Sequence, residues 1–249
     1  MYPPNLTRAI GSCLAVAVAL VGAGCGSSSS SSSNSGSSSS SPKTTPSSTT
    51  QAAGTNSSLG GLASLGPLIS PGAPGPLGPE GIPIPAVPVL ADRATTSSPR
   101  PIDGIQCLGS EQTLFHIHAH LTLFLGGAAR QIPGGIGIID PQIQSNQAGP
   151  FVAGGRCFYW LHTHAADGLI HIESPVQRTF TLGDFFDVWG QPLTADRVGP
   201  ASGKVTAIVN GKLYHGDPRN IRIDSFAQIQ LEVGAPLVAP TTISFPAGL

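Results

Sequence analysis

A serine-rich tract near the N-terminus sets the strongest limit on what this chain can fold into. From Gly26 to about Ser58 the sequence contains almost only Ser, Thr, Gly and Asn. Such a composition offers too little apolar surface to offset the conformational entropy lost when a chain becomes ordered. We therefore expect this tract to be disordered and the folded domain to lie on its C-terminal side.

The stretch that follows changes in composition without showing the pattern of a strand or a helix. From Leu59 to Pro101 it is rich in Pro, Gly and aliphatic residues, as in the Ile-Pro-Ile-Pro run at 82–85. Proline removes backbone donors and favours an extended, polyproline-like chain, so the sequence predicts a semi-stiff spacer here. Residues 25–102 together are predicted to form a tether, and residues 103–249 a histidine-rich β domain.

The first residues have the features of an export signal. Arg8 precedes an apolar run of small residues, Ala9 to Ala23, which is too short to form a stable membrane span. The run ends just before Cys25 and resembles the lipobox of bacterial lipoproteins, in which the cysteine is acylated and becomes the mature N-terminus. The sequence thus predicts a signal peptide at 1–24 and lipidation of Cys25, for example with palmitate. Ordinary secretory cleavage is the alternative.

These segments predict where the protein resides and which partners it has. A lipid anchor at Cys25 would hold it at the cell membrane or in the outer envelope, with the domain outside the cytoplasm. Only 10% of the residues are charged and the net charge is −1, which excludes an extended basic surface for nucleic acid.

The pattern of the domain is mainly β. Short apolar alternations bounded by Gly, Pro and Asn-Gly dominate it. Val205–Val209 and Lys212–His215 flank an Asn-Gly pair, a strong hairpin signal with a type I′ turn, and Ile229–Val233 predicts a further strand.

One segment, Thr181–Trp189, is predicted to be helical. Thr181 and Asp184 have capping-box spacing, and Gly190 followed by Pro192 ends the segment. The fold class expected is therefore a mainly β domain, a sandwich or a barrel, with one short helix.

Three histidines alternate with apolar residues on a predicted strand. His116, His118 and His120 project to one face of the strand, while the apolar residues between them project to the other. One face is thus expected to be core and the other a row of imidazoles, which bind metal ions when neutral. A polar face that is histidine-rich by chance is the alternative.

A second cluster lies on two predicted strands joined by an Asp-Gly turn. His162 and His164 precede the turn, and His171 and Glu173 follow it. A two-residue turn places His164 opposite His171, whereas a four-residue turn places His162 there. Either register gathers three imidazoles and a carboxylate on one face, where two or three nitrogens can reach one ion at about 2.0–2.1 Å. Glu173 is expected to be a ligand, a partner that orients an imidazole, or a general base.

The cysteines predict a crosslink rather than a copper ligand. Cys107 and Cys157 remain after export and lipidation, and an oxidising compartment favours a disulfide between them. Cys157 has the opposite strand parity to His162, which argues against a blue-copper site. The only methionine, Met1, lies in the signal, which excludes a thioether-rich copper(I) site.

Three segments resemble a group of uncharacterised exported bacterial and archaeal proteins. They are a His-x-His-x-His-Leu strand at 116–121, a Leu-His-Thr-His-x-x-x-Gly-x-Ile-His-Ile-Glu segment at 161–173 and a Phe-Thr-Leu-Gly-x-Phe-Phe-Asp-x-Trp-Gly segment at 180–190. The resemblance covers most of residues 107–234 and implies no established activity. Where that group often has Asp after the second His-Thr-His, this chain has Ala165.

The clusters predict a site for Zn²⁺ or Cu²⁺. The candidate ligands are His116, His118, His120, His162, His164, His171 and Glu173. We expect a binding module that captures, buffers or hands over the ion outside the cytoplasm. One alternative is a three-histidine metalloenzyme that uses a metal-bound hydroxide, and another is a disulfide-stapled cell-surface module with incidental histidines. His215, alone at a strand end, is left outside the site.

Overall fold

The computed structural model describes residues 58–93 and 99–249, which belong to one compact unit. The predicted signal peptide, Cys25 and the serine tract up to residue 57 lie outside the described residues. Within them the protein is mainly β with one α-helix, and its sheets are open rather than closed into a barrel. The predicted fold class is confirmed in its sandwich-like form.

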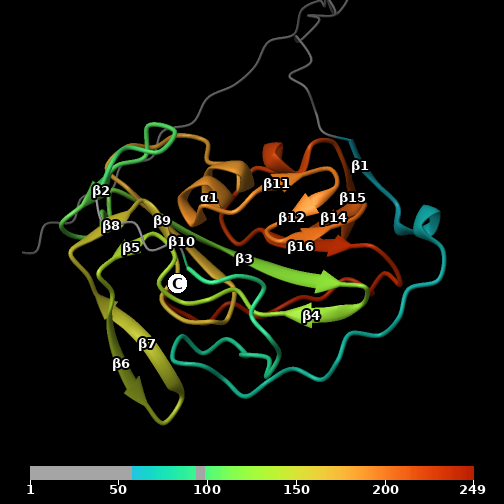
Figure 1. The fold of residues 1–249 in the computed structure, drawn as a ribbon, viewed down its shortest axis with the longest axis horizontal. Helices are drawn as coiled ribbons and strands as arrows, with labels where there is room; N and C mark the ends of the chain where they lie inside the picture. Colours follow the sequence, from blue (N-terminus) through green and yellow to red (C-terminus); the bar gives the residue numbers. More distant parts are fainter. Residues whose placement is uncertain (1–57, 94–98) are drawn as a thin grey trace, which may run out of the picture. The chain divides into compact units, whose positions relative to one another are not determined.

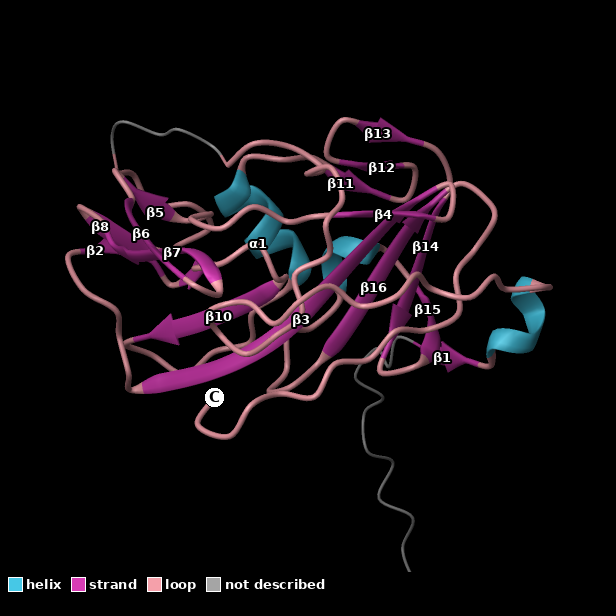
Figure 2. Cartoon of the chain, turned by 90° about the horizontal axis from the view of Figure 1, so that it is seen from below, coloured by secondary structure: helices cyan, strands magenta, loops and turns pink. Residues whose placement is uncertain are grey.

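The largest sheet carries the histidines. Its strands, in spatial order, are β1 (Ser58–Gly60), β15 (Lys212–His215), β14 (Val205–Val209), β16 (Gln228–Val233), β3 (Phe115–Leu125), β10 (Leu169–Ser174) and β9 (Leu161–His162), with β4 (Ala128–Arg130) paired to β3. Figure 2 shows the run from β1 to β10. The pair β16 and β3 is parallel, and the other pairs in this sheet are antiparallel.

Three smaller sheets and three helical segments complete the described elements. The sheets are β11 (Leu193–Thr194), β12 (Arg197–Val198) and β13 (Ala201–Ser202); β2 (Cys107–Leu108), β8 (Cys157–Tyr159) and β5 (Ile138–Ile139); and β6 (Gln142–Asn146) with β7 (Gly149–Gly154). The helical segments are α1 (Leu182–Trp189) and two short 3₁₀ turns, η1 (Leu62–Leu65) and η2 (Pro218–Asn220). No helix of the described residues is long and apolar enough to span a membrane.

The main sheet has one apolar face, which packs under α1. Side chains on a strand alternate between its two faces, and Ala119 and Leu121 of β3 and Ile170 of β10 belong to the same buried cluster as Phe185 and Trp189 of the helix. On β3 and β10, these apolar residues occupy positions that alternate with the histidines of the same strand. The histidines therefore project from the face of the sheet that α1 does not cover.

The predicted helix and hairpin are confirmed. Thr181 and Asp184 form the capping box, and Gly190 ends α1 in a left-handed conformation with φ of 72°. In the hairpin Val209 pairs with Lys212 across Asn210 and Gly211, whose φ angles are both positive, as a type I′ turn requires. These elements form where local propensity and apolar pattern agree.

The predicted spacer is wrong for its described part. Residues 61–93, here called the strap, lie along the domain instead of standing clear of it (Figure 1). Ile82 is fully buried, the backbone N–H of Leu90 donates to the carbonyl of Gln131, and that of Ile69 donates to the carbonyl of Leu237. The prolines do remove donors, but the aliphatic residues between them bury apolar surface and the remaining amides find partners. The domain thus begins well before residue 103.

The predicted disulfide is present. Cys107 of β2 and Cys157 of β8 are joined, with their Cα atoms 5.4 Å apart and a sequence separation of 50. The bridge links two strands that pair directly with each other. It therefore fixes the loop that leads into β3 against the strand that leads into β9.

Candidate metal centre

The strand registers place histidines of three neighbouring strands side by side on one face of the main sheet. His171 of β10 lies opposite His118 of β3 on one side and opposite His162 of β9 on the other. Glu173 lies opposite His116 in the same way. Of the two registers left open by the sequence, the structure has the one that places His162 opposite His171, with residues 163–168 connecting β9 to β10. Both histidine clusters therefore meet on one face.

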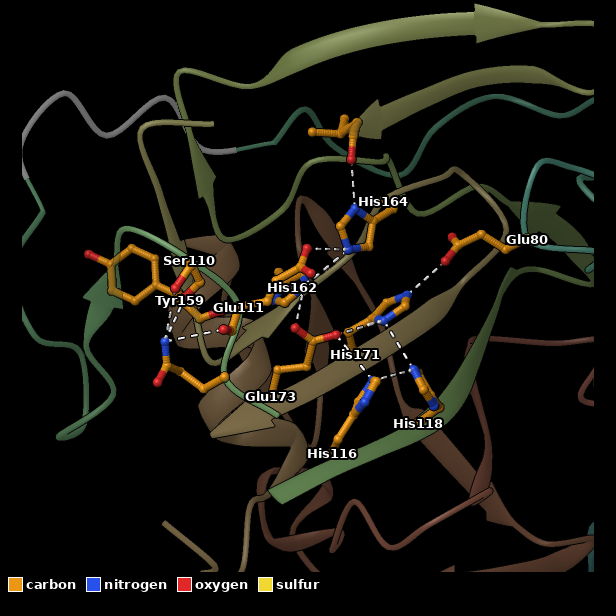
Figure 3. A network of polar contacts seen from close by, with 12 residues as sticks. Glu80, Ser110, Glu111, His116, His118, Tyr159, His162, His164, His171 and Glu173 are labelled. Atoms are coloured by element: carbon orange, nitrogen blue, oxygen red, sulfur yellow. Dashed lines mark hydrogen bonds and ion pairs between the residues drawn. The ribbon is translucent and has the colours of Figure 1, made fainter. Parts of the chain in front are cut away.

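Four ligand atoms converge in what we call the first ligand group, formed by His116, His118, His171 and Glu173 (Figure 3). The Nε2 atom of His118 lies 3.1 Å from both Nε2 of His116 and Nδ1 of His171. The Oε1 atom of Glu173 lies 3.2 Å from Nε2 of His116 and 3.5 Å from Nδ1 of His171. An ion held tetrahedrally at 2.0–2.1 Å separates its ligand atoms by about 3.3–3.4 Å, so these spacings suit one ion.

Glu80 of the strap fixes the orientation of His171. Its Oε1 atom lies 2.8 Å from Nε2 of His171 and, as a carboxylate, accepts the hydrogen bond, which leaves Nδ1 to face the ligand group. Burial alone would lower the pKa of His171, but the hydrogen bonds and charges of Glu173 and Glu80 raise it to about 9. Burial alone would raise the pKa of Glu80, and His171 outweighs this and lowers it. A carboxylate behind a histidine ligand is the usual outer support of a metal site.

The second ligand group consists of His162 and His164 with His171. Nδ1 of His162 donates to the carbonyl of Tyr159 at 2.9 Å, and Nδ1 of His164 donates to that of Val152 at 2.6 Å. In their neutral forms both rings therefore carry a lone pair on Nε2. These two Nε2 atoms face each other at 3.2 Å.

Three of the candidate ligands, unlike His171, are held in the neutral state that metal binding requires. Burial lowers the pKa of His118 to about 4, and burial also lowers the pKa of His162 and of His164. Neutral imidazoles are the form that coordinates metal ions. Phe151 stacks on His164, and Phe158 lies edge-on to His162, so aromatic rings limit the movement of these two side chains.

His120, which the sequence grouped with the ligands, lies apart from them. Its Nε2 atom bonds to the carbonyl of Asp167 at 2.8 Å and its Nδ1 atom lies 3.4 Å from the hydroxyl of Thr122. The residue opposite it on β10 is Leu169, which offers no ligand. His120 instead lines a cavity of about 620 Å³ between the sheet and the strap. Strand parity placed His120 on the same face as the other histidines. Its position along β3, opposite Leu169, keeps it out of both ligand groups.

Two carboxylates of the site were not predicted from the sequence. Glu80 comes from the strap, and Glu111, in the loop before β3, places Oε1 3.3 Å from Nε2 of His164. One signal was present for Glu80, because it is the only charged residue between positions 59 and 91. A lone charge in an apolar stretch needs a partner if the stretch is buried.

Comparison of the chain with family models, curated proteins and solved structures finds no match. The resemblance to exported histidine-rich proteins therefore stays a prediction from the three sequence segments.

Proposed function

We propose that this protein binds a divalent transition-metal ion, Zn²⁺ or Cu²⁺, at the first ligand group. The observation that carries the proposal is the convergence of three imidazole nitrogens and one carboxylate oxygen at neighbour spacings of 3.1–3.5 Å. Imidazole suits both ions, and the carboxylate adds a negative charge that offsets part of the ionic charge. Glu80 supplies the outer hydrogen bond that holds His171 in its ligand orientation.

The exposure of the ligands favours reversible binding. The side chain of His116 is 39% exposed, whereas that of Glu173 is 5% exposed. An ion can therefore enter and leave past His116 while the buried ligands hold the other side of the site. This arrangement supports capture, buffering or handover of a metal ion. With the predicted signal peptide and lipidated Cys25, the ion would be handled outside the cytoplasm at a membrane surface.

The test is metal binding by the protein purified as its host produces it. Chelator-stripped protein is titrated with Zn²⁺ or Cu²⁺, and affinity, stoichiometry and melting temperature are measured. We expect binding tighter than micromolar and a rise in melting temperature, because an ion that binds only the folded state stabilises it. The variant His118→Ala should lose the ion of the first ligand group, and His215→Ala, at an exposed position on β15, should bind as the parent does. Failure of the parent to bind, or unchanged binding by His118→Ala, would contradict the proposal.

A further inference from the structure

We infer that the centre holds two metal ions, with Glu173 as the bridging ligand and His162, His164 and Glu111 completing the second position. This inference rests on the proposed function, since it adds a second ion to the first. It assigns a role to the atoms that the first ligand group leaves unused. Three independent features of the structure support it.

The first feature is the pair of facing nitrogens on His162 and His164. Both rings use their Nδ1 protons on backbone carbonyls, so neither neutral ring has a proton to place between the two Nε2 atoms. Two lone pairs at 3.2 Å repel unless something positive lies between or beside them. Their separation is close to the spacing of about 3.3–3.4 Å between neighbouring ligands of a tetrahedral ion.

The second feature is the position of the two oxygens of Glu173. Oε1 faces His116 and His171 of the first group. Oε2 is buried, has no hydrogen-bond partner among the described residues, and lies 3.9 Å from Nε2 of His162. A buried carboxylate oxygen without a hydrogen bond is costly. Each oxygen thus points toward a different set of imidazoles, which is the geometry of a carboxylate bridge.

The third feature is Glu111, which approaches from the solvent side. Its Oε1 atom lies 3.3 Å from Nε2 of His164, and its side chain is 41% exposed. Ligand atoms of Glu111, His162 and Glu173 all lie within 4.8 Å of one another. A neutral His164 has no proton on Nε2 to donate to this carboxylate. A cation shared by the two groups explains their approach.

The arrangement of charge agrees with two cations. Three carboxylates, those of Glu80, Glu111 and Glu173, contact the imidazoles of this one face. One divalent ion in the first group leaves the contacts of Glu111 and of Oε2 of Glu173 unexplained.

The test counts bound ions in a set of matched variants. The parent, saturated with Zn²⁺ and freed of excess metal, should contain two ions per chain. Glu111→Gln, at an exposed position where the fold is not at risk, should weaken one ion at least tenfold and leave the other unchanged. His164→Ala should also retain a single ion, as should His118→Ala, but the ion retained differs. In the Cu²⁺ form, the two ions of the parent should be magnetically coupled. This coupling should be absent from His164→Ala and from His118→Ala, because each of these variants retains one ion.

The outcomes separate this inference from the proposed function. A parent that saturates tightly with a single ion, lost in His118→Ala, would overturn the second position and leave the proposed function intact. Two ions with affinities unchanged in Glu111→Gln and His164→Ala would also overturn it, because the second ion would then lie elsewhere. A parent that binds no ion would overturn the proposed function itself. Glu173→Gln should weaken both ions, whereas a ligand of the first position alone would weaken only one.

Discussion

The candidate metal centre is formed by two kinds of segment, the regular strands that carry the histidines and the irregular strap. β3, β9 and β10 are regular, so the alternation of their residues predicts which side chains share a face. The strap has no such period, and its Pro-Gly composition is shared by mobile linkers and by ordered segments that wrap a domain. Yet the strap supplies Glu80, and the strands supply the ligand that Glu80 supports. Periodicity thus identifies candidate ligands on regular elements, and it misses the groups that irregular segments bring to them.

The sharpest test of the strand half is loss of the histidine that touches both ligand groups. His171→Ala removes a residue that belongs to both the first and the second ligand group and whose Nδ1 atom lies 3.5 Å from Oε1 of Glu173. Metal affinity should fall by more than the tenfold to hundredfold that loss of an outer-shell partner costs. His215→Ala is the matched control, because His215 is exposed on β15 and absent from both groups. Chelator-competition titration measures the difference, and equal affinities in the two variants would break the assignment.

Reduction of the predicted disulfide tests how much of the domain's stability depends on this crosslink. Reducing a bridge that spans 50 residues should lower the free energy of unfolding by about 4 kcal/mol in the chain-entropy model. Denaturant unfolding of the protein with and without reductant measures this change. The variant Cys107→Ser, which cannot form the bridge, should match the reduced parent. A reduced protein as stable as the oxidised one would show that the frame of the domain is set by packing alone.

The strap half is tested by Ile82, which is fully buried. Ile82→Ala should lower the free energy of unfolding by about 2–5 kcal/mol, because it removes buried methyl groups and leaves a cavity. Leu77→Ala is the matched control on the same segment, since Leu77 is 62% exposed and should change stability by no more than about 0.5 kcal/mol. If both variants unfold at the same denaturant concentration as the parent, the strap is a spacer after all, and the contrast between the two regions disappears.

Much of the fold could be predicted because local and global signals agree there. Thr181 with Asp184 and the Asn210-Gly211 pair are short-range signatures whose geometry depends on a few neighbouring residues. Strand parity likewise placed His118 and His171 on one face. The main-sheet order could not be predicted, because the parallel pairing of β16 with β3 joins segments about a hundred residues apart and leaves no local mark.

The sequence named the histidines and Glu173 that the structure brings together, and it did not name the nearby carboxylates of Glu80 and Glu111. The register between β9 and β10 decides whether His162 or His164 lies opposite His171. Strand pattern does not report it, because residues 163–168 connect the two strands and the backbone at 163 and 164 bonds to other segments instead of to β10. His120 shares the parity of His118, but it lies two residues further along β3 and is not part of either ligand group. Contacts such as that of Glu80 depend on tertiary packing of a segment without period, which no pattern within the chain reports.

The smallest expected effect is that of Glu80→Gln, which alters the contact between the strap and His171 of β10. The amide keeps the size of the side chain but loses the charge that stabilises the protonated imidazole of His171. In the metal-free protein, NMR titration should show the pKa of His171 falling below its value of about 9. A group that served only to pack the strap would leave that pKa unchanged.

Metal affinity in this variant depends on pH through two opposing effects. Below pH 9 an ion must displace a proton from His171, so affinity in the parent rises with pH until that pKa, about 9, is passed. Glu80→Gln lowers the pKa and weakens this proton competition, which offsets its loss of support for the ligand at neutral pH. Above pH 9, His171 is deprotonated in both proteins and only the loss of support remains. In chelator-buffered metal at that pH the variant should bind about tenfold more weakly or worse, with the number of bound ions unchanged. Equal affinities there would show that the strap covers the centre without supporting its ligands.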